Sequence, residues 1–412
     1  MYKTGTLSRE ACPQKQVGIM EWWSNIRLKS KDPQVRRKTI ESLDLERGLS
    51  PQLFETLAAC LKDEDGQVRG AAAKALGMTQ DDRAPELVRP LLWDPSPDAR
   101  QAAASALGHL GDPLATGPLK GALKDPNSNV RASAAAALRS LGWRPASNEE
   151  QALLDIASGN VKAASFQGDA AVNPLVSELT NDTSFSRRAA AEALEEAGDP
   201  RRIQPLLAAV NDSEPMVRVS AIHALAKADS EDITAALLRA LRDPEWCVRL
   251  AATQGLSKRN DPELVPYFFG PLGDAHFEVR LTAVQFLSRF RNPEIVEGLV
   301  KRLSDKDSDV RMAAAKGLGA SGDPAAIAGL VLALVDDERA IRHVAELSLK
   351  EIDANWAQTE AAQKAGAGLA AATAKRPEWV RAAAGQVVAR LRAAAEAAAA
   401  AQSEGSAVPS TS

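Results

Sequence analysis

The side chains best able to do chemistry in this sequence are an evenly spaced set of arginines and aspartates. The arginines follow one another at 31-residue intervals, apart from one interval of 56, and an aspartate stands six residues before nearly every arginine. Guanidinium and carboxylate groups form strong bidentate hydrogen bonds, so such a set builds an internal ladder or, if left unpaired, binds anions. We favour a structural ladder, because the aspartates would neutralise an anion site. Its members are Asp63, Arg69, Asp94, Arg100, Asp125, Arg131, Arg187, Asp212, Arg218, Asp243, Arg249, Asp274, Arg280, Asp305, Arg311, Asp336 and Arg342.

No other grouping of side chains points to catalysis. The four histidines are far apart and none precedes a glutamate, while the three cysteines, Cys12, Cys60 and Cys247, form no Cys-x-x-Cys pair. Neither a glycine-rich phosphate loop nor a nucleophile or zinc-protease motif is found. We therefore predict a protein that is not an enzyme, with no catalytic residue, no bound metal and no cofactor.

Composition bounds the class of protein. Hydrophobic residues make up 45% of the 412 residues but aromatic residues only 4%, which predicts a core of alanine, leucine and valine. A net charge of −4 is unlike the basic surface that binds nucleic acid, so no nucleic-acid partner is expected. No apolar run approaches the roughly 20 residues of a membrane helix, and no signal peptide is recognisable. We expect a cytoplasmic monomer with no membrane contact.

The elements that must position the ladder are helices. In Val68-Arg69-Gly70-Ala71-Ala72-Ala73-Lys74-Ala75-Leu76, apolar residues recur with the spacing of one helix face, and related strings surround the other arginines. A second apolar stretch precedes each such string. Gly-Asp-Pro, as at 111–113, supplies a helix stop, a cap and a first helical turn. Each unit is thus helix A, a turn with the aspartate, and helix B with the arginine. A single pair cannot bury its apolar faces, so the pairs must stack.

This period and motif resemble the short HEAT-like repeats first named from phycobilisome lyases, over about residues 20 to 390. The resemblance implies an all-α, right-handed solenoid of about eleven antiparallel helix pairs, and is more specific for fold than for function. HEAT-like deoxyhypusine hydroxylases hold iron through His-Glu pairs, which this sequence lacks.

The repeats also predict a domain organisation. Residues 1–19 form a disordered or non-native lead, and 20–352 form the solenoid. A 25-residue insertion explains the 56-residue interval and gives an inserted helical segment at 143–168, which packs on the rim, bends the array or forms a binding hairpin. Residues 353–402 form a divergent repeat with a capping helix, and 403–412 a disordered tail.

A partner-binding surface is expected on helix B. The residue after the repeat arginine should point partly outward, and it is apolar in four consecutive repeats. These side chains either fill gaps between neighbouring helices or form a hydrophobic groove with aromatic anchors. The candidates are Trp246, Phe277, Val219, Leu250, Leu281, Met312, His223, Gln254 and Gln285.

We therefore predict a non-enzymatic scaffold or adaptor that binds a protein or peptide along the concave face of a solenoid. Two alternatives remain. One is an accessory or lyase-like protein acting on a bilin chromophore–protein pair, which only the name of the repeat suggests. The other is a DNA-binding HEAT-like protein, against which the acidic balance argues.

Overall fold

The computed structural model describes residues 22–45, 49–181 and 183–405, and within these ranges it is helical without a strand. The predicted lead at 1–19 and residues 406–412 of the predicted tail lie outside the described residues. The chain divides into two compact units, Met1–Leu206 and Leu207–Ser412. The division falls inside α13 (Ile203–Ala209).

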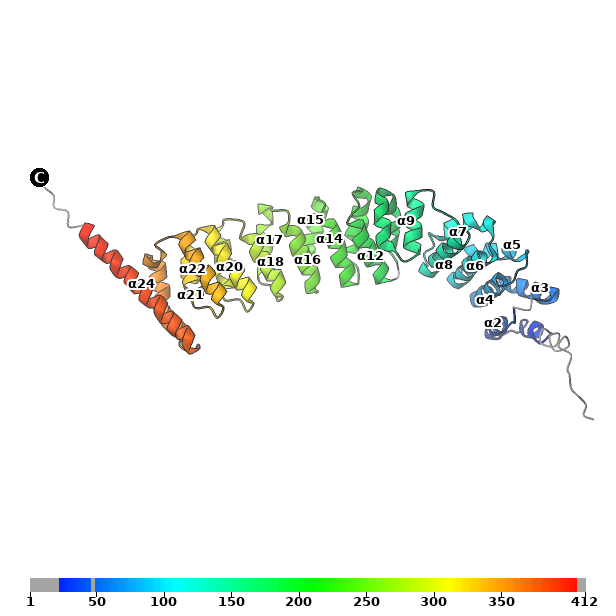
Figure 1. The fold of residues 1–412 in the computed structure, drawn as a ribbon, viewed down its shortest axis with the longest axis horizontal. Helices are drawn as coiled ribbons and strands as arrows, with labels where there is room; N and C mark the ends of the chain where they lie inside the picture. The colour runs from blue at the N-terminus through cyan, green and yellow to red at the C-terminus, as the bar shows by residue number, and fades with distance from the viewer. Residues whose placement is uncertain (1–21, 46–48, 182, 406–412) are drawn as a thin grey trace, which may run out of the picture. The chain divides into compact units, whose positions relative to one another are not determined.

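The first unit consists of helices that alternate between the A and B positions (Figure 1). Short 3-10 turns (η) precede or extend several A helices. In chain order the elements are α2 (Pro33–Glu41), α3 (Pro51–Ala59), η1 (Cys60–Lys62), α4 (Gly66–Gly77), α5 (Ala84–Val88), η2 (Arg89–Trp93), α6 (Pro97–Leu110), η3 (Pro113–Ala115), α7 (Thr116–Ala122), α8 (Ser128–Ser140), α9 (Asn148–Ala157), α10 (Val161–Ala164), η4 (Ser165–Ala171), α11 (Val172–Glu178), α12 (Ser184–Leu194) and η5 (Pro200–Arg202).

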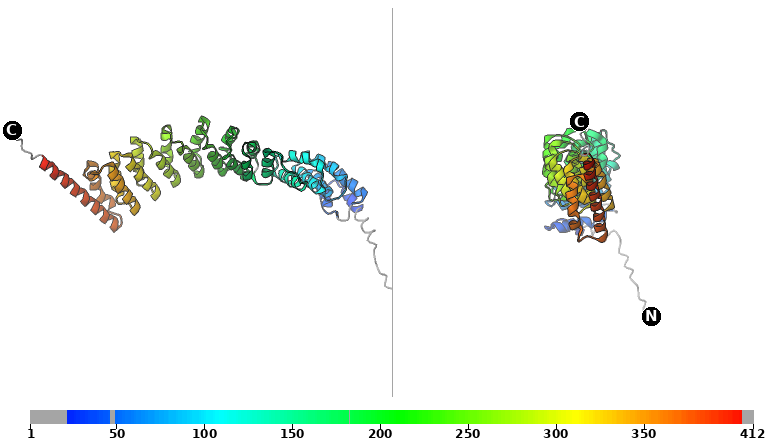
Figure 2. Two further views of the ribbon diagram at one scale, coloured as in Figure 1. Left: turned by 45° about the horizontal axis from the view of Figure 1, so that its top comes forward. Right: turned by 90° about the vertical axis from the view of Figure 1, so that its left-hand side faces the viewer.

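The second unit repeats the same alternation, and Figure 2 shows its successive pairs side by side, followed by the long helix α24 in red. Its elements are α14 (Pro215–Leu225), α15 (Glu231–Ala240), α16 (Trp246–Ser257), η6 (Pro262–Leu264), α17 (Val265–Leu272), α18 (Phe277–Leu287), α19 (Pro293–Arg302), α20 (Ser308–Ser321), η7 (Pro324–Ala326), α21 (Ile327–Ala333), α22 (Arg339–Ile352), η8 (Trp356–Gln358), α23 (Glu360–Thr373) and α24 (Glu378–Gly405). The predicted all-α fold of stacked helix pairs is confirmed.

The Gly-Asp-Pro turns end one helix and begin the next. Gly111 adopts the left-handed conformation, with φ of 67°, directly after α6. The Asp112 side chain then accepts a hydrogen bond from the Leu114 amide at 3.0 Å, and Pro113 begins η3. Asp323 caps η7 in the same way after Gly322. These turns let each repeat fold back with its backbone groups satisfied.

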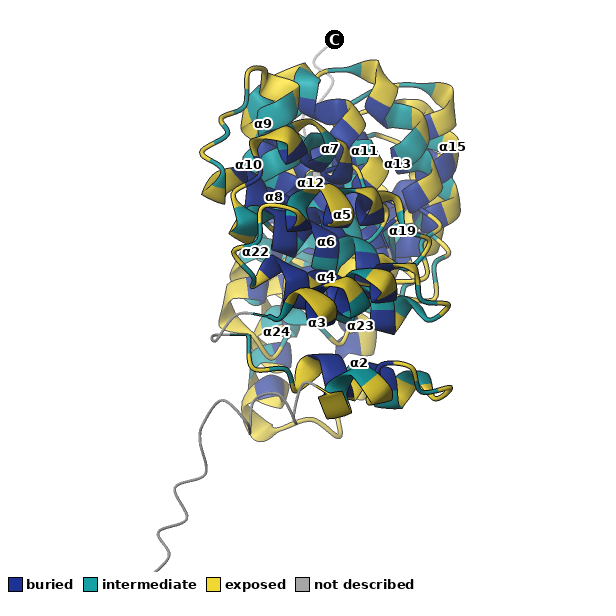
Figure 3. Ribbon diagram, turned by 90° about the vertical axis from the view of Figure 1, so that its right-hand side faces the viewer, coloured by how far each residue is buried: buried dark blue, intermediate teal, exposed yellow. Residues whose placement is uncertain are grey.

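Close helix packing explains why the core is rich in alanine. Helix α6 packs on α4 and on α8, and Figure 3 shows the buried residues of these helices in dark blue. A methyl group added at Gly77 would lie 2.6 Å from the Ala106 Cα atom, and one added at Gly108 would lie 2.8 Å from the Ala137 Cα atom. Neighbouring B helices therefore touch almost backbone to backbone, and larger side chains are excluded from this seam.

The predicted insertion is better described as a shortened repeat. Helix α9 takes the A position and packs on α10, which has only 4 residues, whereas the regular B helices α4 and α12 have 12 and 11. Lys162 on α10 stands 31 residues after Arg131, so the period continues through this segment, and Arg187 follows after a further 25. The interval of 56 thus contains one full step and one step shortened by six residues. Lysine stands here in place of the repeat arginine, so the arginine spacing does not show this register.

The predicted divergent repeat at the C-terminal end is a pair formed by α23 and α24. Val335, Leu369, Val380 and Ala384 form a small buried cluster beneath it. The guanidinium carbon of Arg342, the last arginine of the 31-residue series, lies 5.0 Å from the centre of the Trp379 ring, and Trp379 is on α24. Arg342 thus makes a cation–π contact with Trp379, whereas the earlier repeat arginines pair with an aspartate.

The helix seam provides a direct test of this packing. Gly77→Ala should lower the free energy of unfolding by about 1–3 kcal/mol, because its methyl group would meet the backbone of Ala106. The matched change Gly270→Ala, in α17, meets no atom within 4 Å and should raise stability by about 0.5–1 kcal/mol. Urea denaturation followed by circular dichroism measures both. Equal effects at the two glycines would show that the seam is looser than described.

Candidate functional site

The arginines of the ladder join each repeat to the next. The Nε and Nη2 atoms of Arg249 donate to the two carboxylate oxygens of Asp274 at 2.7 and 2.9 Å. Its Nη1 atom donates to the carbonyl oxygens of Asp243 and Pro244, both at 2.9 Å. One guanidinium therefore holds the turn of its own repeat and the aspartate of the following one.

The aspartate is fixed by the same arrangement. Asp274 Oδ1 also accepts a hydrogen bond from the His276 amide at 2.8 Å. Burial acts to raise the pKa of Asp274, but the hydrogen bonds from Arg249 and from the His276 amide outweigh it and hold that pKa below its usual value. The carboxylate is thus kept ionised within a half-buried pair.

The same kind of ion pair recurs in both units. The pairs are Arg36–Asp63, Arg69–Asp94, Arg100–Asp125, Arg218–Asp243, Arg280–Asp305 and Arg311–Asp336, at 2.6 to 2.8 Å. Arg187 donates to the carbonyl oxygen of Asn181 at 2.9 Å, and Arg342 to that of Asp336 at 2.7 Å. In these pairs the guanidiniums are already occupied by carboxylates, which favours structural ion pairs over a row of anion-binding arginines.

The predicted partner-binding residues of the second unit lie on the B helices. Val219, Leu250, Leu281 and Met312 are each half-buried, on α14, α16, α18 and α20 respectively. Gln254 and Gln285 are exposed one helical turn further on, and His223 is half-buried. We call these seven residues the helix B face. Because the apolar members are neither fully buried nor fully exposed, they contact neighbouring helices and still present surface to a partner.

A groove of about 470 Å³ lies between α18 and α20. It brings together Leu281, Gln285 and Met312 of the predicted set, whereas the other four members of the face do not line it. Sequence reasoning did not assign the remaining lining residues to the site. They are Ser288, Asp309, Ala313, Lys316, Gly317 and Ala320. Gly317 allows α20 to pack closely on the end of α18, since an added methyl group would lie 2.1 Å from the Ser288 hydroxyl oxygen.

The two predicted aromatic anchors meet through a histidine. The Trp246 ring stacks on the His276 ring, with centroids 3.8 Å apart and planes inclined by 9°. The Phe277 ring lies 5.2 Å from the same histidine. Trp246 is 42% exposed, while Phe277 is half-buried. His276, which sequence reasoning did not single out, therefore supports the Trp246 ring at the surface. Of the two predicted anchors, Trp246 is the exposed one.

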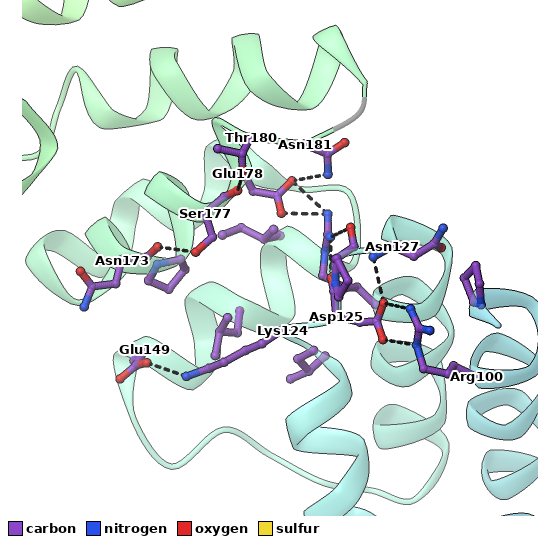
Figure 4. Close-up of a pocket in the computed structure, with 17 residues that line it drawn as sticks. Arg100, Lys124, Asp125, Asn127, Glu149, Asn173, Ser177, Glu178, Thr180 and Asn181 are labelled. Carbon is purple, nitrogen blue, oxygen red and sulfur yellow. Dashed lines mark hydrogen bonds and ion pairs between the residues drawn. The ribbon is translucent and has the colours of Figure 1, made fainter. Parts of the chain in front are cut away.

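A second pocket, of about 510 Å³, lies in the first unit beside the shortened repeat (Figure 4). Its walls come from the start of α6, the turn after α7, the start of α8, α9, and α11 with the turn that follows. Arg131 and Glu178 form a buried ion pair here, in which Arg131 Nη2 donates to Glu178 Oε2 at 3.0 Å and lies 2.8 Å from Oε1. Asn181 donates to Glu178 as well, at 3.1 Å. Arg131 therefore pairs with a glutamate on α11 and not with a residue of the shortened repeat.

Sequence reasoning did not predict a role for Glu178, although a signal was present. Glu178 stands nine residues before Arg187, and alanine occupies that position before Arg131, Arg218, Arg249 and Arg342. Burial raises the pKa of Glu178 above its usual value, against the opposing effects of Arg131 and Asn181. The position is charged in one other repeat, where Arg302 stands nine residues before Arg311, so the charge marks Glu178 only together with the 56-residue interval that ends at Arg187.

Two further observations concern the part of the chain that the structure describes. No cluster of three or more histidine, cysteine, aspartate or glutamate side chains there is arranged to hold a metal ion. None of the helices within the described ranges combines the length and the apolar character needed to cross a membrane.

Stacked helix pairs joined by arginine–aspartate pairs define an α-helical solenoid, a class of protein that typically serves as a scaffold for protein interactions. The chain belongs to the HEAT repeat family, whose model matches residues 20–99, 87–162, 203–270 and 271–350, more than half of the sequence. The PBS lyase HEAT-like repeat matches residues 186–212. These matches confirm the family resemblance drawn from the 31-residue period. No curated protein matches the chain.

Several solved structures resemble this one at low sequence identity. An engineered protein is 19% identical, with 81% of this chain and 98% of that chain covered and a TM-score of 0.38. Human deoxyhypusine hydroxylase is 21% identical, with 83% and 99% covered and a TM-score of 0.26. Importin beta is 15% identical, with 90% and 61% covered and a TM-score of 0.35.

The ladder should contribute measurably to stability. Arg249→Leu leaves the half-buried Asp274 carboxylate without its partner, so it should lower the free energy of unfolding by about 2 kcal/mol or more. Lys301→Ala, which removes the exposed pair with Glu297, should leave the urea midpoint unchanged. If the two variants unfold at the same urea concentration, the ladder does not stabilise the stack.

The two kinds of carboxylate should respond to pH in opposite directions. Folding lowers the pKa of Asp274, so its contribution to stability is complete above about pH 4 and is lost as pH falls through the folded pKa. Folding raises the pKa of Glu178, so its contribution is complete below about pH 4 and is lost as pH rises through the folded pKa.

Consequently, the destabilisation caused by Asp274→Asn should grow between pH 3 and pH 7, whereas that caused by Glu178→Gln should shrink. Thermal unfolding of the wild type and both variants across this range measures the difference. Parallel trends for the two variants would contradict the assigned directions.

Proposed function

We propose that this protein is a non-enzymatic scaffold that binds a segment of a protein partner across the helix B face of the second unit. The observation that carries the proposal is the groove between α18 and α20, which joins Leu281 and Met312 to the exposed Gln285. Apolar surface next to amide groups suits a peptide, because side chains can enter the groove while backbone groups bond to glutamine.

The repeat spacing favours an extended peptide that runs across successive B helices. Packed helices lie about 8–10 Å apart. A chain in the polyproline II conformation advances about 3.1 Å per residue with three residues per turn, so every third side chain lies on the same side and would meet the next helix. Leu250, Leu281 and Met312 occupy equivalent positions on successive helices. A partner segment with apolar side chains at every third position would therefore fit this face.

The charges around the groove favour a segment without strong net charge. Among the residues that line it, Asp309 and Lys316 are the ionisable ones, and they carry opposite signs. Trp246, stacked on His276, adds an exposed aromatic ring on α16, the preceding B helix. Exposed aromatic rings are frequent energetic anchors of protein interfaces, so we assign this ring to the same binding surface.

Photo-crosslinking in the native cell tests this proposal. A photoreactive amino acid at Gln285 should give a discrete adduct with a partner protein, and the same group at the exposed Glu297 on α19 should not. Adding Leu281→Ser and Met312→Ser should reduce the Gln285 adduct at least tenfold while leaving the circular dichroism spectrum unchanged.

Identical adducts at Gln285 and Glu297, or an adduct insensitive to the two serine substitutions, would overturn the assignment of this face. The loss of Trp246 is measured separately. Trp246→Ala should reduce the yield of the partner adduct formed at Gln285. Leu114→Ser, which removes an exposed leucine of the first unit, should leave that yield unchanged.

A further inference from the structure

The helical segment before α2 exposes its largest apolar side chains to solvent. Residues 22–27 are helical, and Trp22, Trp23 and Ile26 are between 47% and 59% exposed. Residues three and four apart lie on the same side of a helix, so these three side chains share one face. Leu28, which follows the helix, is buried in the core of the first unit. We call the exposed face, formed by Trp22, Trp23 and Ile26, the N-terminal patch.

The N-terminal patch is open surface and not the wall of the neighbouring pocket. The rings of Trp22 and Trp23 pack edge to face, with centroids 5.5 Å apart and planes inclined by 78°. A pocket of about 420 Å³ in this region is lined by Leu28, Lys29 and residues between 52 and 63, and by no member of the patch. A large apolar surface that no described residue covers marks a place of interaction.

The same stretch of chain is strongly basic. Residues 22–38 contain six lysines and arginines and one aspartate, which gives a net charge of +5 in a chain whose net charge is −4. Arg36 pairs with Asp63, and Arg37 with Glu41. The other four cations are exposed and pair with no carboxylate among the described residues. They are Arg27, Lys29, Lys31 and Lys38.

The cations stand close enough to the patch to meet one surface together with it. Arg27 follows Trp23 by four residues and so lies on the same side of the helix, and Lys29 and Lys31 follow in the turn before α2. Tryptophan rings favour the boundary between lipid headgroups and acyl chains, and neighbouring lysines and arginines are attracted to anionic headgroups. The partner that combines both properties is an anionic lipid surface.

Nucleic acid, the other common polyanion, fits this segment less well. Proteins hold single strands by stacking bases on open aromatic faces. Ile26 offers no such face, and the edge-to-face contact of Trp22 with Trp23 covers part of the aromatic surface.

We propose that the N-terminal patch docks the protein on an anionic lipid bilayer. The side chains of Trp22, Trp23 and Ile26 enter the headgroup region, and Arg27, Lys29 and Lys31 contact the lipid phosphate groups around them. This binding departs from the expectation of no membrane contact, which concerns segments that span a bilayer, because binding at the surface needs none. The site lies in the first unit and is independent of the helix B face.

Co-sedimentation of the full-length protein with lipid vesicles tests the proposal. The protein should bind vesicles made from a three-to-one mixture of phosphatidylcholine and phosphatidylglycerol at least tenfold more tightly than vesicles of phosphatidylcholine alone. Added salt should weaken this binding, because it screens the attraction between the cations and the lipid. Absence of binding to the anionic vesicles, or equal binding to both kinds, would overturn the proposal.

Two pairs of substitutions link the binding to this segment. Trp22→Ser with Trp23→Ser, and separately Lys29→Glu with Lys31→Glu, should each lower the affinity for anionic vesicles at least tenfold. All four side chains are exposed, so the circular dichroism spectrum and the urea midpoint should not change. Undiminished binding by either folded variant would contradict the assignment.

Matched changes elsewhere control for the loss of aromatic surface and of positive charge. Trp93→Ser removes an exposed tryptophan of the same unit. Lys258→Glu with Lys306→Glu makes the same change of net charge at exposed positions of the second unit. Both controls should bind like the wild type. If either loses as much affinity as the N-terminal variants, the binding is not specific to the patch and the proposal fails.

Two further readouts separate insertion into lipid from binding to other polyanions. Vesicles with brominated acyl chains should quench tryptophan fluorescence more strongly in the wild type than in the Trp22→Ser, Trp23→Ser variant. A single-stranded oligonucleotide should not displace the protein from anionic vesicles. Equal quenching of the two proteins would overturn the proposal, and displacement by the oligonucleotide would overturn it in favour of nucleic acid.

Discussion

The bidentate bond between a repeat arginine and the aspartate of the next repeat is the interaction on which this structure depends. A helix pair of this size has apolar surface on both sides, and it becomes stable only when neighbouring pairs cover that surface. Arg249 fixes how its neighbour is placed, because it binds the turn of its own repeat and Asp274 of the following one. The hydrophobic seam supplies most of the attraction, and the ion pair sets the register.

The same dependence explains the pocket in the first unit. When α10 is shortened and Ile156 takes the aspartate position, the ladder has no carboxylate at the expected distance along the chain. Arg131 instead reaches Glu178, a residue of the following repeat. This alternative pair lines the space that the break in the pattern leaves open. A local change in repeat length thus creates a pocket within the array.

The helix B face and the pocket beside Arg131 differ in size and in the chemistry of their surfaces. The helix B face is a repeated, half-buried apolar row, and it suits a long segment held by many weak contacts. The pocket beside Arg131 is a single local site whose lining combines paired charges with apolar side chains. Both arise from positions where side chains of adjacent repeats do not fill the space between helices, at Leu281 and Met312 in one unit and at Arg131 in the other.

The sequence by itself determined the helix pairs, their period, and the aspartate and arginine of each pair, because local helix spacing and turn chemistry repeat every 31 residues. It also placed Leu281 on helix B. Only the tertiary structure decided that His276 stacks between Trp246 and Phe277, and that Arg131 pairs with Glu178 across 47 positions. Those contacts join different repeats, and their geometry depends on how closely neighbouring helices pack, which a periodic sequence pattern does not specify.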